Sequence, residues 1–536
     1  MASSIDPIDW LVIAIYLIAL LGFAYYLSRG QHNREDYYVG GRKIGSWPIA
    51  ISILATQCST NSILGAPAFV AFAAGGGLLW LQYELAVPLA MLVIILVLVP
   101  VFRALKLVSV YGFLEQRFDL RTRLLLSGLF QFVRAFATAV TVYSIALVIE
   151  LITGLSFFWS VVLLGLFTVV YDVMGGIKGV IYSDVAQMII LVAMLLIVFV
   201  SLVADAGGLS AMLQTVPSER LQTLRFDKHG FGDGHTFAFW PMLFGGLFLY
   251  VSYYGCDQSQ AQRVLSSDSQ QGSVKALFYN GLLRFPLVAL YCFVGVGIAA
   301  YAINNSEFIG SLPANGEQTN YNLAVPVYMI QQLPVGLVGM ALVALFAAAM
   351  SSLDSVLNSL SATTMEDFIF RFRQKKWSLK RELWVSRLIT ATWGLITLTM
   401  AFFVGDIAST VLEAINKIGS LANGPVLAVF MLGVLTRIVS ANAVITGMLA
   451  GFLFNAYCWI ELPNLSWLWW NVTGFIVTVI VALLFTLAQR TTKQAAFSPL
   501  SQKLDLQSNA RYVRTISFTL LIWFALMFSA LLYQST

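Results

Sequence analysis

Long apolar runs recur from one end of this chain to the other, and they constrain its fold more than any other feature. Each run is about 20 residues long, the length an α-helix needs to cross the hydrocarbon core of a bilayer. The runs are continuous rather than alternating, so they predict helices and not the strands of a barrel. The sequence therefore predicts an all-α, polytopic membrane protein with about 14 transmembrane helices. The predicted spans are 9–28, 46–74, 78–102, 124–152, 156–174, 180–205, 237–255, 276–303, 335–363, 384–405, 411–435, 440–460, 466–489 and 512–533.

Charged residues are scarce and unevenly divided between the loops. They make up 11% of the chain, whereas a soluble protein carries about 25%. Of the 31 Lys and Arg residues, 25 fall in every second loop, Arg263 among them, and the loops between hold only Arg220, Arg225 and Lys228. Cytoplasmic loops carry the excess of Lys and Arg. The pattern therefore predicts a multi-pass protein of the plasma (inner) membrane with both termini outside.

The connecting segments disfavour several classes of function. The longest of them, 206–236, 364–383 and 490–511, are too short for an ATPase or kinase domain, and the sequence has no G-x-x-x-x-G-K-[ST] motif. The four cysteines lack disulfide or metal spacing, and the three histidines fall in loops. The net charge of +5 follows the membrane topology, so no nucleic-acid partner is expected. A secondary transporter or a channel is favoured over an enzyme.

The predicted span 335–363 is apolar at first and becomes polar half-way along. Hydroxyls and carboxylates in hydrocarbon are costly unless satisfied, so the polar part must face protein, water or an ion. Small residues with oxygen ligands suit a hard cation such as Na+. The alternative is a helix–helix seam whose serines bond back to carbonyls of their own helix. The polar residues are Ser351, Ser352, Asp354, Ser355, Asn358, Ser359 and Ser361.

Two spans combine polar residues with helix breakers at mid-membrane. The second contains ATQCSTNS at 55–62 followed by Gly65 and Pro67, and the seventh ends in YVSYYGCDQSQAQR. Such segments are typical of discontinuous helices, whose freed carbonyls coordinate ions; a kinked, packed helix is the alternative. The two spans hold positions one and six of a ten-helix core. A five-plus-five inverted repeat pairs these two positions.

That repeat predicts four parts of the chain. Residues 1–45 form an extra N-terminal helix and an inner loop, and residues 46–206 form the first repeat. Residues 207–437 form the second repeat, and residues 438–536 form extra C-terminal helices.

Ionisable and amide groups also occur inside other spans, where they are candidates for function. Snorkelling to the interface is the alternative for Arg284 and Lys417, and Glu413 could pair with Lys417 at i,i+4. The candidates are Gln82, Tyr83, Glu84, Arg134, Asp184, Arg284, Glu413, Asn416 and Lys417.

Seven motifs between about Tyr37 and Arg437 resemble those of the sodium/solute symporter family, whose members carry sugars, sialic acid or monocarboxylates. The resemblance implies the LeuT-type fold of ten core helices in inverted repeats. The motifs are YYVGGR, SILATQCSTNSILGAP, PVFRALKLVSVYGFLEQRF, VYDVMGGIKGVIYSDVAQ, YYGCDQSQAQRVLS, AAAMSSLDSVLNSLSATTMEDF and INKIGSLANGPVLAVFMLG.

The resemblance also implies where ions bind. The family's sodium site falls on the carbonyls of Ala55, Cys58 and Ala348 and the hydroxyls of Ser351 and Ser352. Asp184 matches an acidic residue near the inward exit of that ion. Some members bind a second sodium with this aspartate and serines of the polar helix. Here Ser355 is kept, but Asp354 stands at another of those serine positions.

The solute positions are implied in the same way. Tyr253 falls at the aromatic inner gate of sugar transporters, and Arg284 at a lysine that contacts sugar. Arg134 resembles the arginine that binds carboxylate in sialic acid members, and guanidinium binds carboxylate bidentately. The implied solute-binding residues are Gln57, Ser59, Ser62, Glu84 with Gln82 as the competing choice, Arg134, Tyr253, Arg284 and Asn416.

The sequence thus predicts a sodium-coupled symporter that imports a small organic solute by alternating access, with Na+ and the solute as partners in the bilayer. A sugar or polyol is the first expectation for the solute. A carboxylate-bearing solute such as sialic acid or a monocarboxylate is the second. An ion channel and a non-transporting sensor are the alternatives from other classes. A channel is disfavoured because the polar groups cluster at one depth, and a sensor because no effector domain is visible.

Overall fold

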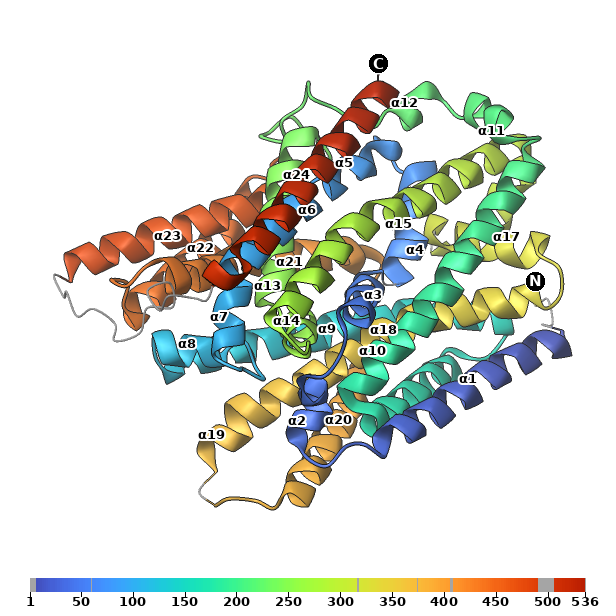
Figure 1. Ribbon diagram of the computed structural model, residues 1–536. Helices are drawn as coiled ribbons and strands as arrows, with labels where there is room; N and C mark the ends of the chain where they lie inside the picture. Colours follow the sequence, from blue (N-terminus) through green and yellow to red (C-terminus); the bar gives the residue numbers. More distant parts are fainter. Residues whose placement is uncertain are drawn as a thin grey trace.

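The chain folds almost entirely into α-helices (Figure 1). The computed structural model describes residues 6–58, 60–315, 318–373, 375–404, 408–489 and 506–535, with the side chains at 60–61, 315, 318, 408–418 and 506–510 left out. Within these ranges the strands are β1 (Ala314–Asn315) and β2 (Gln318–Thr319), which pair antiparallel. The all-α fold class is confirmed.

The first half of the chain supplies the elements up to α14. Its elements are α1 (Pro7–Ser28), α2 (Arg34–Val39), η1 (Gly40–Arg42), α3 (Ser46–Gln57), α4 (Thr60–Phe72), η2 (Leu78–Trp80), α5 (Leu81–Glu84), α6 (Ala86–Val93), η3 (Ile94–Leu98), α7 (Val99–Ala104), α8 (Gly112–Arg117), α9 (Leu120–Thr153), α10 (Phe157–Asp205), α11 (Leu209–Thr215), α12 (Ser218–Leu221), η4 (Pro241–Gly245), α13 (Gly246–Cys256) and α14 (Gln258–Leu265).

The second half completes the bundle and adds helices around it. Its helical elements are α15 (Gln270–Asn304), α16 (Ser306–Ser311), η5 (Tyr321–Leu323), α17 (Ala324–Gln332), α18 (Leu337–Thr363), η6 (Thr364–Ile369), α19 (Phe370–Phe372), α20 (Leu379–Ala401), α21 (Ala408–Leu435), α22 (Ala441–Glu461), α23 (Trp469–Ala488) and α24 (Leu506–Ser535).

Most of the long helices have the length and apolar composition of membrane spans. Within the described ranges ten helices meet this test, and α3 with α4 makes a further candidate bent by 55°. The sequence predicts two spans, 156–174 and 180–205, where the structure has the single α10 of 49 residues. A straight helix of that length would be about 74 Å long, more than twice the roughly 30 Å of the hydrocarbon core. A kink resolves this mismatch, because Gly176 breaks the helical geometry at φ 53°.

Helices α3, α4, α10, α15 and α18 pack on one another at the centre of the bundle. In Figure 1, α22 and α23 lie beside α21 on one flank, and α1 lies along α10 on the other. Helix α1 also contacts α18. Asp9 of α1 is 2% exposed, and its Oδ1 accepts the backbone N–H groups of Gly336 (2.7 Å) and Gly339 (2.6 Å). The first N–H groups of a helix lack partners within it, so α1 caps α18.

Asp9→Ala should lower the free energy of unfolding by about 0.5–2 kcal/mol, the usual cost of losing a cap. The two N–H groups would otherwise stay buried and unsatisfied. Thermal unfolding of the purified protein in detergent measures the change. Asp9→Asn, which keeps an acceptor oxygen, is the control, and its melting temperature should lie between those of the parent protein and Asp9→Ala. An alanine variant as stable as the parent would contradict the cap.

Helix α4 is held by close packing. Gly295 of α15 lies against α4, where an added Cβ would come within 2.7 Å of Val70 Cβ and 2.8 Å of the Pro67 carbonyl oxygen. Backbone atoms cannot move aside as the end of a flexible side chain can. The glycine therefore fixes how close α4 and α15 approach.

Gly295→Ala should cost about 1–3 kcal/mol through overpacking. The expected sign is a lower melting temperature of the purified protein. Gly128→Ala is the matched control, because Gly128 also lies in a long helix and an added Cβ there would have nothing within 4 Å. Equal melting temperatures for the two variants would rule out the close contact.

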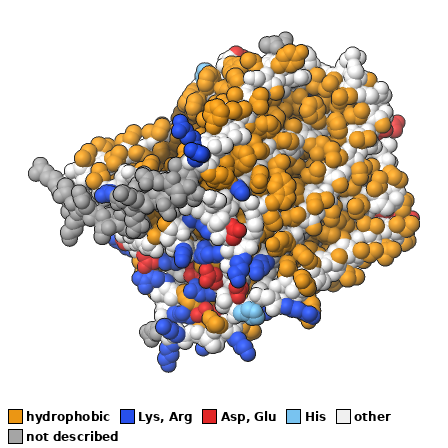
Figure 2. Space-filling model, viewed as in Figure 1, with side chains coloured by type: hydrophobic (Ala, Val, Ile, Leu, Met, Phe, Trp, Pro, Cys, Tyr) orange, Lys and Arg blue, Asp and Glu red, His pale blue; other side chains and the backbone are white. Residues whose placement is uncertain are grey.

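The surface divides into an apolar face and a charged end. Figure 2 shows hydrophobic side chains over much of the visible face, with Lys and Arg gathered at the lower end, where Figure 1 places α2, α8 and α19. The cations there pair with carboxylates: Arg123 with Asp367 at 2.6 Å and Arg371 with Glu115 at 2.7 Å. This end carries the basic loops that the sequence predicts to be cytoplasmic.

Candidate functional site

The second predicted span is a broken helix, as its polar residues and breakers indicate. Helix α3 ends at Gln57, and Cys58 departs from helical geometry with φ −77° and ψ 63°. The Cys58 N–H still reaches the Leu54 carbonyl at 2.8 Å. The carbonyls that follow in the last turn of a helix have no N–H partner within it. The break therefore presents the Ala55 and Thr56 carbonyls to a neighbouring helix.

Helix α18 supplies hydroxyls to these carbonyls. Ser351 Oγ lies 3.4 Å from the Ala55 carbonyl oxygen and 3.1 Å from that of Ala348. Ser352 Oγ lies 3.4 Å from the Thr56 carbonyl oxygen and 3.3 Å from that of Ala348. Ala55, Ala348 and Ser351 are buried, and Ser352 is half-buried. Four of the five predicted sodium-site residues thus converge, and the Cys58 side chain is buried beside them.

The three carbonyls and two hydroxyls that meet here have more oxygen lone pairs than the two hydroxyl hydrogens can satisfy. A hydroxyl has one hydrogen, so Ser351 can donate to only one of its two neighbouring carbonyls, and Ser352 likewise. The serines do bond back along their own helix, as the seam interpretation predicts, but the same hydroxyls also face carbonyls of another helix. An excess of buried oxygen acceptors is what a hard cation such as Na+ binds.

A buried arginine that sequence reasoning missed lies next to this oxygen cluster. Arg263 of α14 is fully buried, although the sequence counts it among the loop charges. Its Nε donates to Ser52 Oγ at 2.6 Å, and its Nη2 lies 3.3 Å from Asp184 Oδ2 and also bonds Ser355 Oγ. Ser52 Oγ donates to the same Asp184 oxygen at 2.5 Å. Asp184 and Ser355, two candidates for a second sodium, are therefore already bound to a cation.

Asp354 lies on the same helix and is fully buried. Its Oδ1 accepts from Ser355 Oγ at 3.1 Å, while its Oδ2 has no partner in the described part of the chain. Ser355 also lies 3.1 Å from Thr56 Oγ1. Asp354 thus contacts the arginine cluster through one shared hydroxyl.

The seventh predicted span is also broken. Helix α13 ends at Cys256 and α14 begins at Gln258, with Asp257 extended between them at φ −85° and ψ 127°. Asp257 Oδ2 binds Arg134 of α9 through Nε (2.6 Å) and Nη2 (2.5 Å). The Arg134 guanidinium lies 5.0 Å from the centre of the Tyr253 ring. Asp257, which sequence reasoning did not single out, follows the aromatic run directly and could have been suspected from its place at the break.

A second buried ion pair joins α5, α13 and α15. Arg284 Nε lies 3.0 Å from Glu84 Oε2, and the Tyr250 hydroxyl donates to Glu84 Oε1 at 3.1 Å. Arg284 is 4% exposed and Glu84 1%, so the snorkelling interpretation of Arg284 is wrong. Its Nη1 has no partner among the described residues. Gln82, the competing choice, instead binds the Phe237 carbonyl at 3.0 Å.

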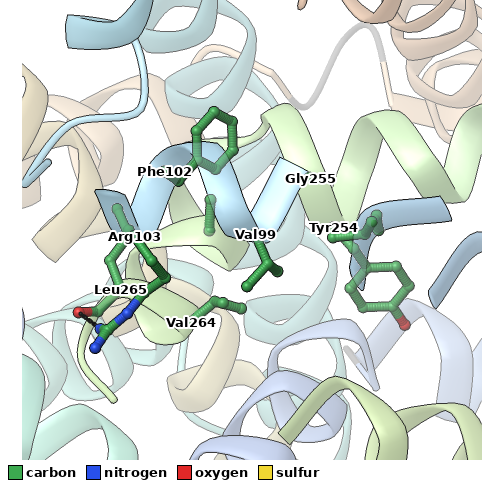
Figure 3. Close-up of a pocket in the computed structure, with 9 residues that line it drawn as sticks. Val99, Phe102, Arg103, Tyr254, Gly255, Val264 and Leu265 are labelled. Atoms are coloured by element: carbon green, nitrogen blue, oxygen red, sulfur yellow. Dashed lines mark hydrogen bonds between the residues drawn. The ribbon is translucent and has the colours of Figure 1, made fainter. Parts of the chain in front are cut away.

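Aromatic rings connect the Arg284–Glu84 pair with Arg134. Ring centres lie 4.8 Å apart for Tyr83 and Tyr250, 6.0 Å for Tyr250 and Tyr254, and 5.3 Å for Tyr254 and Tyr253. Beside Tyr254 a gap of about 10 Å³ remains between α13, α14, η3 and α7, lined by the residues of Figure 3. Figure 3 shows the Tyr254 side chain on the far side of this gap from Arg103. A gap of this size holds about one water, so it is no solute site.

The structure describes only some of the other residues predicted to bind the solute or to act within a span. Ser62 Oγ donates to the Gln57 carbonyl at 3.3 Å across the α3–α4 break, and Gln57 Oε1 is buried without a partner in the described ranges. Ser59 and the side chains of Glu413, Asn416 and Lys417 lie outside the described residues.

Comparison with known proteins assigns the chain to a family. The profile of the sodium:solute symporter family matches residues 37–451, more than three quarters of the chain. The chain belongs to this family. The match covers both broken helices and α18, and the sequence resemblance is confirmed. Members of the sodium:solute symporter family are transporters rather than enzymes.

Three similar proteins of this kind are named for the transport of sialic acid or monocarboxylates. A sodium/sialic acid symporter of Aliivibrio fischeri is 29% identical over 487 residues, covering 90% of this chain and 94% of that protein. The sodium-coupled monocarboxylate transporter 1 of Xenopus laevis is 29% identical over 455 residues, covering 84% of this chain and 71% of that protein. A solved Na+-coupled sialic acid symporter, substrate-bound and outward-open, matches with a TM-score of 0.80 and 25% identity, covering 91% of this chain and 99% of that one.

These matches confirm the LeuT-type helical fold and a multi-pass membrane transporter. Na+ is the coupling ion, and a small-molecule solute is its co-transported partner in the lipid bilayer.

Proposed function

We propose that this protein imports a carboxylate-bearing solute, such as sialic acid or a monocarboxylate, together with Na+ by alternating access. The oxygen cluster between α3 and α18 carries the proposal. Na+ binds there to the carbonyls of Ala55, Cys58 and Ala348 and to the hydroxyls of Ser351 and Ser352. The support is the convergence of both serine hydroxyls on carbonyls of a broken helix.

The choice of solute rests on Arg134 and on the relatives. Sequence reasoning put a sugar or polyol first, but the similar proteins carry sialic acid and monocarboxylates. Each guanidinium is held by a carboxylate, Arg134 by Asp257 and Arg284 by Glu84, but the Arg134 side chain is 23% exposed and the Arg284 side chain only 5%. Arg134 is therefore the more accessible guanidinium for a carboxylate. Tyr253, under that guanidinium, forms one wall of the solute site.

The remaining predicted residues take supporting roles. Gln57 and Ser62 offer polar groups at the α3–α4 break, next to the ion. Ser59 and Asn416 keep the solute-binding roles that the family resemblance implies. Glu84 and Arg284 form a neutral buried pair that supports the site.

The topology follows from the same proposal. The chain crosses the plasma (inner) membrane 14 times if α10 counts as two spans divided at Gly176 and if the α3–α4 pair, η4 with α13, and α21 each count as one span beside the other nine helices. Residues 46–206 and 207–437 are the inverted repeats, flanked by extra helices at 1–45 and 438–536. Both termini lie outside; in Figure 1 both lie away from the charged end seen in Figure 2.

Coupling follows from the position of the ion between two helices. Na+ held by α3 and α18 together stabilises the outward-open state, in which the solute binds beside it. Each ligand then raises the affinity for the other by the same factor. An inside-negative potential drives the inward step with about 2.3 kcal/mol per charge per 100 mV.

Solute binding can be tested without knowing the natural substrate. Melting temperatures are measured with sialic acid, lactate or glucose, each in NaCl and in choline chloride. Stabilisation by a carboxylate solute, and only in sodium, is the expected result. Stabilisation by glucose alone would contradict the carboxylate assignment, and equal stabilisation in choline would contradict sodium coupling.

Arg134→Ala should weaken binding of the carboxylate solute by about tenfold or more, because a charge-assisted pair is worth at least about 1.4 kcal/mol. Arg284→Ala, compared at equal folded concentration, tests the alternative. Solute affinity is measured by uptake competition in proteoliposomes. Loss confined to Arg134→Ala supports a carboxylate, and loss confined to Arg284→Ala supports a sugar.

A further inference from the structure

The guanidinium that is proposed to bind the solute already holds a carboxylate of the chain itself. Asp257 Oδ2 accepts from both Nε (2.6 Å) and Nη2 (2.5 Å) of Arg134. These two N–H groups form one of the edges on which a guanidinium binds a carboxylate bidentately. A solute carboxylate that uses this edge must displace Asp257, and one that uses the other edge would lie beside a like charge, which is unfavourable.

Asp257 can release Arg134 without undoing the start of α14. Its two carboxylate oxygens have separate partners. Oδ1 accepts the Ser259 N–H at 2.9 Å and the Ser259 hydroxyl, which caps α14, and Oδ2 binds Arg134. The Asp257 backbone is extended between α13 and α14, and its side chain is 14% exposed. The bond to Arg134 can therefore break while the cap stays in place.

The charges of this pair connect solute binding with sodium. Arg134 and Asp257 together carry no net charge. A carboxylate solute adds one negative charge to a largely buried site, and an uncompensated charge in such a place is costly. One Na+ bound at the same time restores the balance. A neutral solute such as glucose has no charge with which to replace Asp257 on the guanidinium.

Hydrogen bonds also join Asp257 to the oxygen cluster between α3 and α18. Asp257 Oδ1 holds the Ser259 N–H, and the Ser259 carbonyl accepts from Arg263 Nη1. Arg263 Nη2 donates to Ser355 Oγ, which donates to the Ser351 carbonyl. Ser351 is one of the two serines of the oxygen cluster. A change at Asp257 is therefore connected through bonded groups to the residues that are proposed to hold the ion.

We propose that Asp257 is an internal counter-ion of Arg134 which the solute's carboxylate replaces, so that an anionic solute binds only together with Na+. The inference rests on the proposed function, because it takes Arg134 as the partner of the solute and the oxygen cluster as the sodium site. It makes Asp257 the residue that sets both the selectivity for anions and the sodium dependence of their binding. If Asp257 merely positioned Arg134, its loss would instead weaken binding in the presence and in the absence of sodium.

Equilibrium binding to the purified full-length protein tests this, with lactate and sialic acid as probes, each in NaCl and in choline chloride. The unchanged protein should bind a carboxylate in NaCl and at least about tenfold more weakly in choline chloride, within the usual range of coupling between two ligands. Asp257→Asn should bind it about tenfold more tightly in NaCl, because a like charge is gone. This variant should bind about as tightly in choline chloride as in NaCl.

Further variants separate the charge of Asp257 from its packing. Asparagine keeps an oxygen for the Ser259 N–H, so the cap of α14 is retained. Ser259→Ala removes a hydroxyl bonded to Asp257 but leaves the charge, and it should keep the sodium dependence. Arg134→Ala added to Asp257→Asn should remove the gained affinity, because the gain comes from the freed guanidinium. Isothermal titration calorimetry measures the dissociation constant of each protein.

The possible results separate the two proposals. Weaker binding by Asp257→Asn in both salts would overturn the inference, as would a sodium dependence equal to that of the unchanged protein. If Asp257→Asn does not fold, Asp257→Ser, which also keeps a capping oxygen and removes the charge, takes its place. If neither variant folds, Asp257 is not exchangeable and the inference fails. No binding of either carboxylate to the unchanged protein in NaCl would instead refute the proposed function.

Discussion

Arg284→Ala should lower the free energy of unfolding by about 3–5 kcal/mol, the cost of stranding one partner of a buried ion pair. Glu84 would lose both guanidinium bonds, at 3.0 and 3.4 Å, and keep only the Tyr250 hydroxyl. Because Glu84 is 1% exposed, water cannot replace them. The melting temperature of the purified protein should fall sharply.

The paired variant Glu84→Gln/Arg284→Met is the control. Replacing both charges by groups of similar size removes the stranded carboxylate, and such replacements are often near neutral in stability. The double variant should therefore melt close to the unchanged protein. A single variant that melts at the same temperature as the double variant would show that the two side chains do not depend on each other.

Ser352→Ala should raise the sodium concentration that gives half-maximal uptake by about tenfold, equivalent to about 1.4 kcal/mol of lost ion binding. The change removes one of the two hydroxyls that face the carbonyls of α3 and leaves the apolar contacts of α18 in place. The maximal rate at saturating sodium should change less than the half-saturation value. Uptake into proteoliposomes over a range of sodium concentrations measures both.

Ser359→Ala is the matched control for this change. Ser359 lies on α18 two turns further on, and its hydroxyl donates to the Ser355 carbonyl at 2.8 Å. It should leave half-saturation by sodium unchanged. Equal shifts in the two variants would mean that any serine of α18 matters to packing and would remove the case for a ligand.

The oxygen cluster between α3 and α18 could be predicted because both of its halves are visible locally in the sequence. A polar run inside an apolar span marks Ser351 and Ser352, and a polar patch followed by Gly65 and Pro67 marks the break near Ala55. The family motifs then supply the register between the two. The structure brings these segments together without any contact that contradicts the pairing.

Arg263 shows what the sequence could not supply. It follows the end of an apolar run, so the charge count assigns it to a loop. Its burial depends on Ser52 and Asp184, which lie 211 and 79 residues away. No local pattern reports such partners. The same holds for Glu84, whose preference over Gln82 became visible only through its contact with Arg284.

The division of α10 falls between these cases. The lengths of the apolar runs predict two spans, 156–174 and 180–205, and the structure has α10, whose helical geometry is interrupted at Gly176 (φ 53°, ψ −161°). Gly176 sits against Tyr37, where a Cβ would lie 2.8 Å from the Tyr37 carbonyl oxygen. The kink is therefore fixed by a tertiary contact as well as by composition.

Stabilisation by sodium is the most direct test of the central claim, that Na+ binds between α3 and α18, because it needs no solute. A ligand that binds only the folded state adds about 2.7 kcal/mol at 100 times its dissociation constant. The purified protein should therefore melt at a higher temperature in NaCl than in choline chloride, and Ser352→Ala should lose most of this difference. Equal melting temperatures in the two salts, or a difference that survives in Ser352→Ala, would contradict sodium binding at this cluster.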